Sequence, residues 1–303
     1  MRKDLLLVCL FCTSSVALAQ KKDLFDLLDE DSIASTVDAN NVIYATFKGT
    51  QLINAATNET PGKGVLQYII AHRFGSFGDD YLYNFFGLDN AQIRMQVDYG
   101  ITNRLNAGIG RSSFLKIADG FVKYQLLQQK SGTINTPFSL ALHSSINYRN
   151  AKYTDNINHY ISDRLSYLHQ AIIARKWNRK LSTLISPSIV HFNLVPTQDD
   201  KNTTAHLTLG GRYKLSTRIA LTAETTFMSN NAYGVPNESG EVRHRVPMAI
   251  GIDIETGGHV FQFHLSNTQS MNAPFWMAQN PYDIRDASVF LGFNVSRVFT
   301  IKE

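Results

Sequence analysis

The sequence predicts an all-β fold: a transmembrane, antiparallel, up-and-down β-barrel of about twelve strands with short periplasmic turns and longer extracellular loops. Two observations predict it. Many strand-length segments alternate apolar and polar residues, and the connections between them are alternately short and long. The alternation is plainest over residues 92–101, where one face carries Ile93, Met95, Val97 and Tyr99 and the other carries Gln92, Arg94, Gln96 and Asp98. Apolar faces on most strands can contact lipid only if the polar faces enclose a lumen.

Residues 1–19 have the order of a secretory signal peptide: two basic residues, an apolar stretch and a small-residue site that ends at Ala19. We expect cleavage after Ala19. Cys9 and Cys12 would leave with this segment, and no other cysteine is present to form a disulfide or bind a metal. A secreted barrel of this kind is expected in the outer membrane of a Gram-negative bacterium.

The rest of the chain has no apolar run of about 18 residues, so no spanning helix is expected. Its mean hydropathy of -0.16 would suit a soluble protein. Mean hydropathy does not reveal barrel strands, because half of their residues face the lumen and are polar. The formal net charge of +4 falls to +3 without Arg2, Lys3 and Asp4, which is too mild to indicate a nucleic-acid partner.

The barrel is expected to span residues 65–303. We expect strands at 65–74, 92–101, 104–112, 120–128, 137–148, 165–177, 181–194, 204–214, 218–228, 247–256, 259–267 and 288–300. Their number is even, which places both termini in the periplasm with the short turns. The long connections at 75–91, 149–164, 229–246 and 268–287 then lie outside the cell. The last strand bears Phe299, an aromatic residue of the kind that barrel assembly machinery reads.

One short stretch occurs twice. Residues 99–105 are echoed by residues 213–219, since each has an aromatic residue, a short polar turn containing a hydroxyl residue, and an arginine before the next strand. Ancestral duplication and convergent turn chemistry both explain such an echo, and both are compatible with a barrel.

Residues 20–64 differ in character from the predicted barrel. An acidic amphipathic stretch is followed by a polar region with one strand-like run, Val42 to Ile53. We interpret the segment as a periplasmic arm or a lumen plug, because the apolar part of this run is unsuited to water. A thirteenth strand or a periplasmic tether would also account for it.

The alternation also assigns the lumen-facing side chains, which are of both signs. The candidates are Arg73, Arg94, Asp98, Lys123, His143, His191, His206, Arg212, Glu224, Asp253, Glu255 and His264. Such a lining predicts no strong ion selectivity by charge sign. A simpler interpretation is that these groups pair across a narrow lumen and hold the wall rigid. The strands at 165–177 and 181–194 alternate poorly, so their facing is the least well defined.

Six motifs resemble an uncharacterised domain-of-unknown-function family of outer-membrane β-barrel proteins. They are Phe47-Lys48-Gly49-Thr50, Pro61-Gly62-Lys63-Gly64, His72-Arg73-Phe74-Gly75, Asn84-Phe85-Phe86-Gly87-Leu88-Asp89, Tyr99-Gly100-Ile101-Thr102 and Gly108-Ile109-Gly110-Arg111-Ser112-Ser113. The resemblance covers nearly the whole chain after the signal peptide. It implies a β-barrel fold and a location in the outer membrane, and it supplies no catalytic residue or substrate.

Two groups of residues are candidates for catalysis or metal binding. His264 and Ser266 are similar to the His-Ser pair of outer-membrane phospholipases, but here the alternation turns both toward the lumen, and residues two apart on a strand do not ensure a hydrogen bond. Four inward histidines have no metal-ligand spacing, and no metal or other cofactor is expected. The aromatic loop at 268–287 is a candidate constriction or partner site, unless it simply packs against its neighbours.

The leading hypothesis is a narrow channel or passive transport component for a small solute, not an enzyme. The second is a closed barrel that acts as a scaffold or docking partner for periplasmic or surface proteins. A hydrolase using His264 and Ser266 is the third. The expected partners are outer-membrane lipid, the barrel assembly machinery and a periplasmic or surface protein.

Overall fold

The computed structural model describes residues 40–77, 82–132, 135–153, 157–195, 200–229 and 244–301. The chain divides into two units, residues 1–38 and residues 39–303, and all described residues belong to the second. The expected signal peptide and residues 20–39 of the expected N-terminal segment lie outside the described residues.

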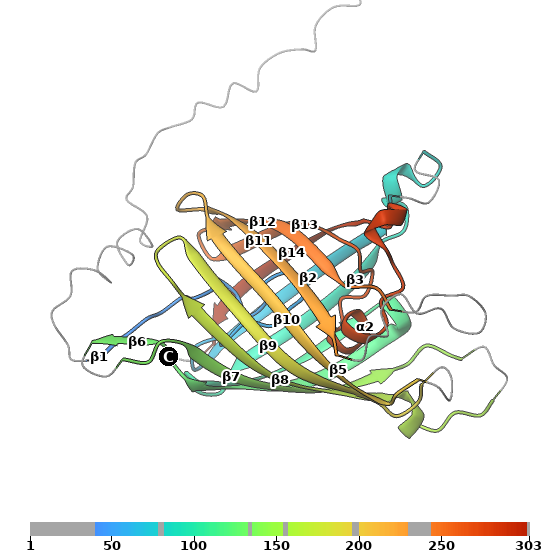
Figure 1. The fold of residues 1–303 in the computed structure, drawn as a ribbon, viewed down its shortest axis with the longest axis horizontal. Helices are drawn as coiled ribbons and strands as arrows, with labels where there is room; N and C mark the ends of the chain where they lie inside the picture. The colour runs from blue at the N-terminus through green and yellow to red at the C-terminus, as the bar shows by residue number, and fades with distance from the viewer. Residues whose placement is uncertain are drawn as a thin grey trace, which may run out of the picture. The chain divides into compact units, whose positions relative to one another are not determined.

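Within the described residues, twelve antiparallel strands form a closed barrel (Figure 1), which confirms the predicted fold. The strands are β2 (Val65–Ser76), β3 (Gln92–Gly100), β4 (Leu105–Ser112), β5 (Ile117–Leu127), β7 (Ser139–Arg149), β8 (Leu165–Lys176), β9 (Leu181–Phe192), β10 (Thr203–Lys214), β11 (Ile219–Met228), β12 (Met248–Thr256), β13 (His259–Ser266) and β14 (Phe290–Thr300). Each strand pairs with its neighbour in sequence, and β14 pairs with β2 to close the sheet. The largest difference from the expected boundaries is at β5, which begins at Ile117 and not at residue 120.

A second, two-stranded sheet lies apart from the barrel strands. β1 (Asn40–Val42) pairs with β6 (Lys130–Gly132), which belongs to the connection between β5 and β7. The expected strand-like run from Val42 to Ile53 does not join the barrel sheet, so the interpretation of this run as a thirteenth strand was wrong.

The helical elements are short. They are η1 (Phe85–Gly87), η2 (Phe114–Lys116), η3 (Ser162–Arg164), α2 (Ala273–Ala278) and η4 (Ile284–Asp286). Among the described residues, no helix combines the length and the apolar character needed to cross a bilayer.

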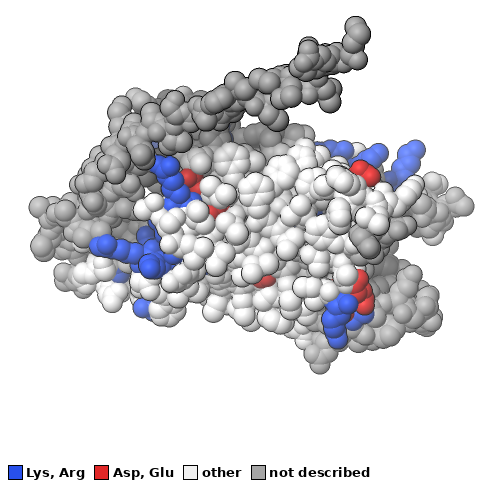
Figure 2. All heavy atoms as spheres, turned by 90° about the horizontal axis from the view of Figure 1, so that it is seen from above, with Lys and Arg blue, Asp and Glu red and all other residues white. Residues whose placement is uncertain are grey.

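The strands turn apolar residues outward and polar residues inward. On β12, Ile250 and Ile252 are 58% and 44% exposed, whereas Gly251 and Asp253, which alternate with them, are buried. Figure 2 shows the result on one face of the molecule: a band of mostly uncharged side chains, with lysine and arginine gathered toward its two ends. This distribution is typical of a barrel wall in contact with lipid.

Two strands depart from this alternation because several of their inward side chains are apolar as well. Leu168 and Ile172 on β8 and Leu184 and Val190 on β9 are almost completely buried. Their outward neighbours are also largely apolar, so the sequence shows no clear period of two over these strands. The poor alternation therefore marks an apolar patch inside the barrel.

Three short turns at one end of the barrel are built in the same way. The hydroxyl of Thr102 accepts the backbone N–H groups of residues 104 and 105, at 3.1 and 3.0 Å. Ser216 does the same for residues 218 and 219, and the Asn178 side chain does so for residues 180 and 181. Because the third turn lies outside the echoed stretches, shared turn chemistry is sufficient to explain the echo.

The outward face predicts a measurable cost for a charge at its centre. Replacing Ile252 by Lys places an ammonium group against the hydrocarbon core, and we expect the free energy of unfolding to fall by about 2–4 kcal/mol. The measurement is equilibrium unfolding of the protein refolded into lipid vesicles. Thr217→Lys, in an exposed turn, is the control and should change stability by less than about 0.5 kcal/mol. Equal effects of the two substitutions would contradict a lipid-facing β12.

Candidate functional site in the barrel lumen

A compact hairpin lies among the inward-facing side chains of the barrel. Thr50 and Thr57 are joined by a backbone hydrogen bond of 3.0 Å, and Leu52 donates to the carbonyl of Ala55 at 2.8 Å to close the turn. Residues 46–59, which we call the lumen hairpin, are largely buried although they belong to no barrel strand.

Glu59 holds the base of the lumen hairpin together. Its Oε1 accepts the backbone N–H groups of Thr46 and Phe47, at 3.0 and 3.3 Å. Burial raises the pKa of the Glu59 carboxyl, while these hydrogen bonds and the nearby charge of Lys123 act in the opposite direction. The hairpin is therefore closed by its own contacts before any contact with the wall is counted.

The hairpin tip is bound by a carboxylate of the barrel wall. Glu224 on β11 accepts the backbone N–H groups of three consecutive residues, Ile53, Asn54 and Ala55, at 3.1, 2.8 and 3.1 Å. A carboxylate is a strong acceptor for backbone donors, particularly where water is excluded. Glu224 is thus the principal anchor of the tip.

Amide side chains of the wall bind the carbonyl groups of the same turn. Gln262 on β13 donates to the carbonyl of Leu52, and Asn294 on β14 donates to that of Ile53 at 3.0 Å. Asn294 also donates to Gln262, at 3.1 Å. Donors and acceptors of the hairpin tip are therefore both satisfied by the barrel wall.

The middle of the hairpin contacts the opposite charges of β3 and β5. Lys123 on β5 donates to the carbonyls of Thr57 and Thr50, at 3.1 and 3.4 Å. The Thr50 hydroxyl donates to Asp98 on β3 at 3.0 Å. A buried ammonium needs such partners, because desolvation penalises its charge.

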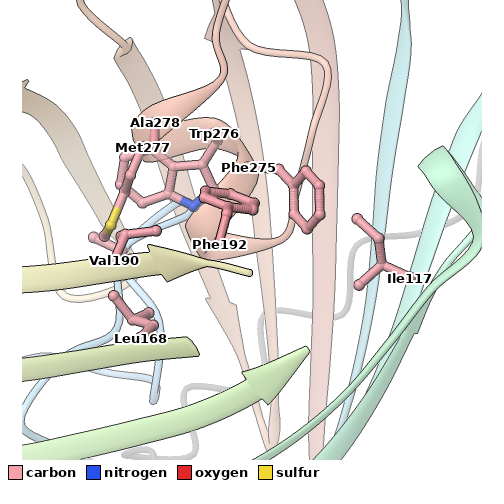
Figure 3. Packing of buried hydrophobic residues seen from close by; sticks show 9 residues of the cluster. Ile117, Leu168, Val190, Phe192, Phe275, Trp276, Met277 and Ala278 are labelled. Atoms are coloured by element: carbon pink, nitrogen blue, oxygen red, sulfur yellow. The ribbon is translucent and has the colours of Figure 1, made fainter. Parts of the chain in front are cut away.

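The long loop at 268–287 also enters the barrel. Its helix α2 places Phe275, Trp276 and Met277 against the apolar patch of β8 and β9 (Figure 3). Phe275 meets Phe192 edge to face, with ring centroids 5.3 Å apart. Ala55 of the lumen hairpin belongs to the same buried cluster. Two segments far apart in sequence thus meet inside the barrel.

Arg73 on β2 links these two segments. Its guanidinium donates to Asn54 Oδ1 of the lumen hairpin at 2.8 Å and to the backbone carbonyl of Thr268 in the loop at 2.7 Å. Arg73 is completely buried. Arg73 is therefore hydrogen-bonded to both inserted segments at once.

Ion pairs occupy the rest of the lumen wall. Arg94 binds both carboxylate oxygens of Asp119, at 2.5 and 2.8 Å. Arg212 pairs with Asp253 at 3.3 Å and with Glu255, which also binds Lys48 of the hairpin at 3.0 Å. The expectation that wall charges pair with one another is therefore met by these groups, and the bidentate pair adds geometric specificity.

A polar cavity of about 50 Å³ remains beside the hairpin. It is lined by Arg94, Asp98, Lys123 and His143 together with residues of the hairpin and of the loop. This volume accommodates a few water molecules. The two inserted segments leave little free space between the wall charges.

The structure places eleven of the twelve lumen candidates on the inward face. Ten are buried and Glu255 is partly buried: the ten are Arg73, Arg94, Asp98, Lys123, His143, His206, Arg212, Glu224, Asp253 and His264. His191 was wrongly assigned. It shares the outward face of β9 with Ile185 and Ile189, and it contacts the Thr203 hydroxyl at 2.7 Å. The inward apolar residues of β9 hid the alternation that would have shown this.

The surroundings of the histidines and of the pair His264 and Ser266 bear on the metal-site and hydrolase hypotheses. No group of three metal-ligating side chains is found in the described ranges. His264 is buried with neither ring nitrogen hydrogen-bonded, whereas the Ser266 hydroxyl donates to the carbonyl of Met248 at 3.1 Å. The two side chains point inward, as expected, without the contact that would activate a nucleophile.

Several wall residues that bind the inserted segments were not predicted, and most of them have amide side chains. Gln262 and Asn294 bind the hairpin. Asp119 and Asn147 bind the loop, because each accepts a hydrogen bond from Asn272, at 3.1 and 3.0 Å. The alternation of apolar and polar residues was sufficient to predict two of them as lumen-facing. Gln262 lies two residues before His264 and so points to the same side of β13, and Asn294 lies on a strand of clear alternation.

Comparison with known proteins supports the fold. The COG4313 outer membrane channel from Pseudomonas putida F1 is similar in structure, with a TM-score of 0.50, 12% identity, and coverage of 80% of this chain and 97% of that one. The NanC porin (TM-score 0.47, 11% identity, 78% and 100% coverage) and the KdgM porin (0.44, 10%, 78% and 99%) are also similar. At these identities the likeness is one of fold alone.

A search of curated proteins finds no match to this sequence. The family model described as "Membrane bound beta barrel domain (DUF5777)" matches residues 47–299, which include the lumen hairpin apart from its first residue and all barrel strands apart from the last residue of β14. The match covers most of the chain and confirms the resemblance predicted from the motifs. The chain therefore belongs to this uncharacterised family of membrane-bound β-barrel domains.

Proposed function

We propose that this protein is an outer-membrane channel for a small solute, in which the lumen hairpin acts as a plug. The observation that carries the proposal is a polar lumen wall filled by a chain segment that is not part of the sheet. A wall that served only to hold a permanent core needs no buried charges, because apolar residues in their place are often neutral or stabilising. A polar wall suits a space that water enters when the segment leaves.

The contacts of the hairpin favour its reversible release. They are mainly hydrogen bonds and ion pairs, which water can replace. The apolar contribution is the smaller one: Phe47 and Leu52 of the hairpin pack with Ala174 and Leu184 of the wall, and Ala55 joins the buried cluster of α2, β8 and β9. Release would expose paired wall charges of both signs, so we expect weak selectivity between anions and cations.

The scaffold hypothesis is the second candidate, and the filled lumen favours it. A barrel that never opens would use its ends, together with residues before β1, to bind periplasmic or surface proteins. The hydrolase hypothesis has less support, because Ser266 and His264 lack a mutual contact. We propose lipid and the barrel assembly machinery as partners under either of the first two hypotheses.

Removal of the hairpin separates the first two hypotheses. In planar bilayers, we expect the refolded protein to be closed or to open rarely, and a variant that begins at Pro61 to conduct steadily. The physical reason is that the truncation removes the inserted segment that is bound by the wall charges, while the loop at 268–287 stays in place. Single-channel current is the measurement. Silence of a folded truncated variant would contradict the channel and favour the scaffold.

Weakening the anchor of the tip should give a graded effect. Glu224→Gln removes the charge that binds three backbone donors, and we expect it to destabilise the closed state by about 1.5–3 kcal/mol. The ratio of open to closed time would then rise about tenfold or more. Thr208→Val is the control, since it removes a buried hydrogen bond of the same wall, to Thr226 at 2.8 Å, that involves no residue of the hairpin. An equal rise in both variants would argue against a specific anchor.

A further inference from the structure

The short connections at one end of the barrel are basic. They span residues 101–104, 128–138, 177–180, 215–218 and 257–258, and all but the last contain lysine or arginine, whereas none contains an acidic residue. The long connections at the other end carry both signs, such as Asp163 and Arg164 before β8, and Asp283 and Arg285 before β14. Positive charge therefore distinguishes the turn end, part of which lies at the left of Figure 2.

The positive charge is densest over two neighbouring turns. These turns and the strand ends beside them carry six basic residues, which we call the basic patch: Arg175, Lys176, Arg179, Lys180, Lys214 and Arg218. β9 pairs with β10, and the backbone N–H of Lys214 donates to the carbonyl of Lys180 at 2.8 Å, so the two turns are in contact. The adjoining strand β12 carries Glu255, but that carboxylate is bound to Arg212 and Lys48. The patch therefore has a strong local excess of positive charge.

Aromatic side chains border the basic patch on the outer surface of the barrel. Trp177 and Tyr213 are 54% and 44% exposed. Tyr213 shares the outward face of β10 with Leu207 and Leu209, which belong to the lipid-facing wall. Tryptophan and tyrosine concentrate where the hydrocarbon of a membrane meets the headgroups. The basic patch thus lies at the level of the headgroups.

One guanidinium of the patch is positioned by the aromatic border. Arg175 is exposed on the outward face of β8, and its Cζ lies 4.2 Å from the centroid of the Trp177 ring. The indole N–H donates to the Thr183 hydroxyl at 2.8 Å, which fixes the ring. A guanidinium stacked on a ring by its face keeps its N–H edge available to an acceptor, and that edge matches a phosphate group.

We propose that the basic patch binds the headgroup of an anionic phospholipid. Its phosphate would accept hydrogen bonds from Arg175 and Arg179, and its acyl chains would lie against the wall beside Tyr213. A soluble acidic partner would contact the charges without using the lipid-facing rings, so the combination of both favours a lipid. With the short turns in the periplasm, as we expect, this lipid belongs to the inner leaflet of the outer membrane. The site goes beyond the proposed channel.

Quenching of Trp177 by brominated lipid tests the proposal in the intact protein. The other tryptophan, Trp276, is 2% exposed and packs inside the barrel, so acyl chains reach Trp177 alone. We would refold the protein into phosphatidylcholine vesicles that contain a fraction of phosphatidylglycerol with brominated acyl chains. The reference is the same fraction of brominated phosphatidylcholine. Both leaflets have one composition, so the orientation of the barrel does not affect the relative affinity measured at Trp177.

We expect phosphatidylglycerol to bind at Trp177 about threefold or more tightly than phosphatidylcholine, and high salt to reduce this preference by screening. Joint replacement Arg175→Gln and Arg179→Gln should lower the preference about twofold or more, because two of its positive charges are lost. Each variant is compared with its own brominated phosphatidylcholine reference, so a change in the indole's fluorescence cancels. Retained migration of the folded form in SDS gels checks that each variant is folded.

The matched control is the joint replacement Arg104→Gln and Arg297→Gln, which removes the same charge from the same end of the barrel. Arg297 is likewise stacked on an aromatic ring, that of Phe299, at 4.8 Å. Other strands separate β14 and the turn between β3 and β4 from β8 and β9. We therefore expect the lipid preference at Trp177 to stay unchanged in the control.

Three results would overturn the proposal. The first is equal affinity of the two lipids in the intact protein. The second is an equal preference in the variant and its matched control, which would assign any effect to the charge of the whole turn end. The third is undiminished quenching in Trp177→Phe, which would place Trp177 away from the lipid. None of these results depends on conduction, so failure of this site is distinguishable from failure of the channel.

Discussion

The closure of the sheet between β14 and β2 is the constraint on which the rest of the structure depends. Backbone groups have no water to bind in hydrocarbon, so a spanning sheet must pair every edge. With the apolar side chains turned outward, the polar side chains of all strands share one enclosed space. Because a buried polar group without a partner is costly, that space has to be filled with partners or with water.

The two inserted segments meet this requirement by different chemistry. The lumen hairpin offers backbone donors and acceptors to Glu224, Gln262 and Asn294. The loop at 268–287 offers apolar side chains to the apolar patch of β8 and β9. Each segment thus matches the part of the wall that it contacts, and Arg73 joins the two. The wall is complementary to its contents, not merely polar.

The strands could be predicted from sequence because lipid and lumen impose a period of two that is visible locally. The same reasoning failed at His191, since β9 turns Leu184 and Val190 inward to meet residues far along the chain. No local pattern reveals such partners: Ser188 of the same strand meets Met277, which lies 89 residues later. The amides that bind the hairpin were missed for another reason: they carry no charge, and the predicted lumen lining comprised charged residues and histidines, although Gln262 lay on the correct face. The plug could not be distinguished from an arm or a further strand, since the residues that bind it are spread over the whole barrel.

The position of the lumen hairpin in the chain has a consequence for folding. It precedes every barrel strand, yet Ile53 binds Glu224 171 residues later and Asn294 241 residues later. Such contacts have very high contact order, and their loop-closure entropy opposes early formation. The hairpin is therefore translated first and secured last, when β14 has joined β2. Assembly in the membrane must keep the unfinished barrel around it, so slow maturation is built into the order of the sequence.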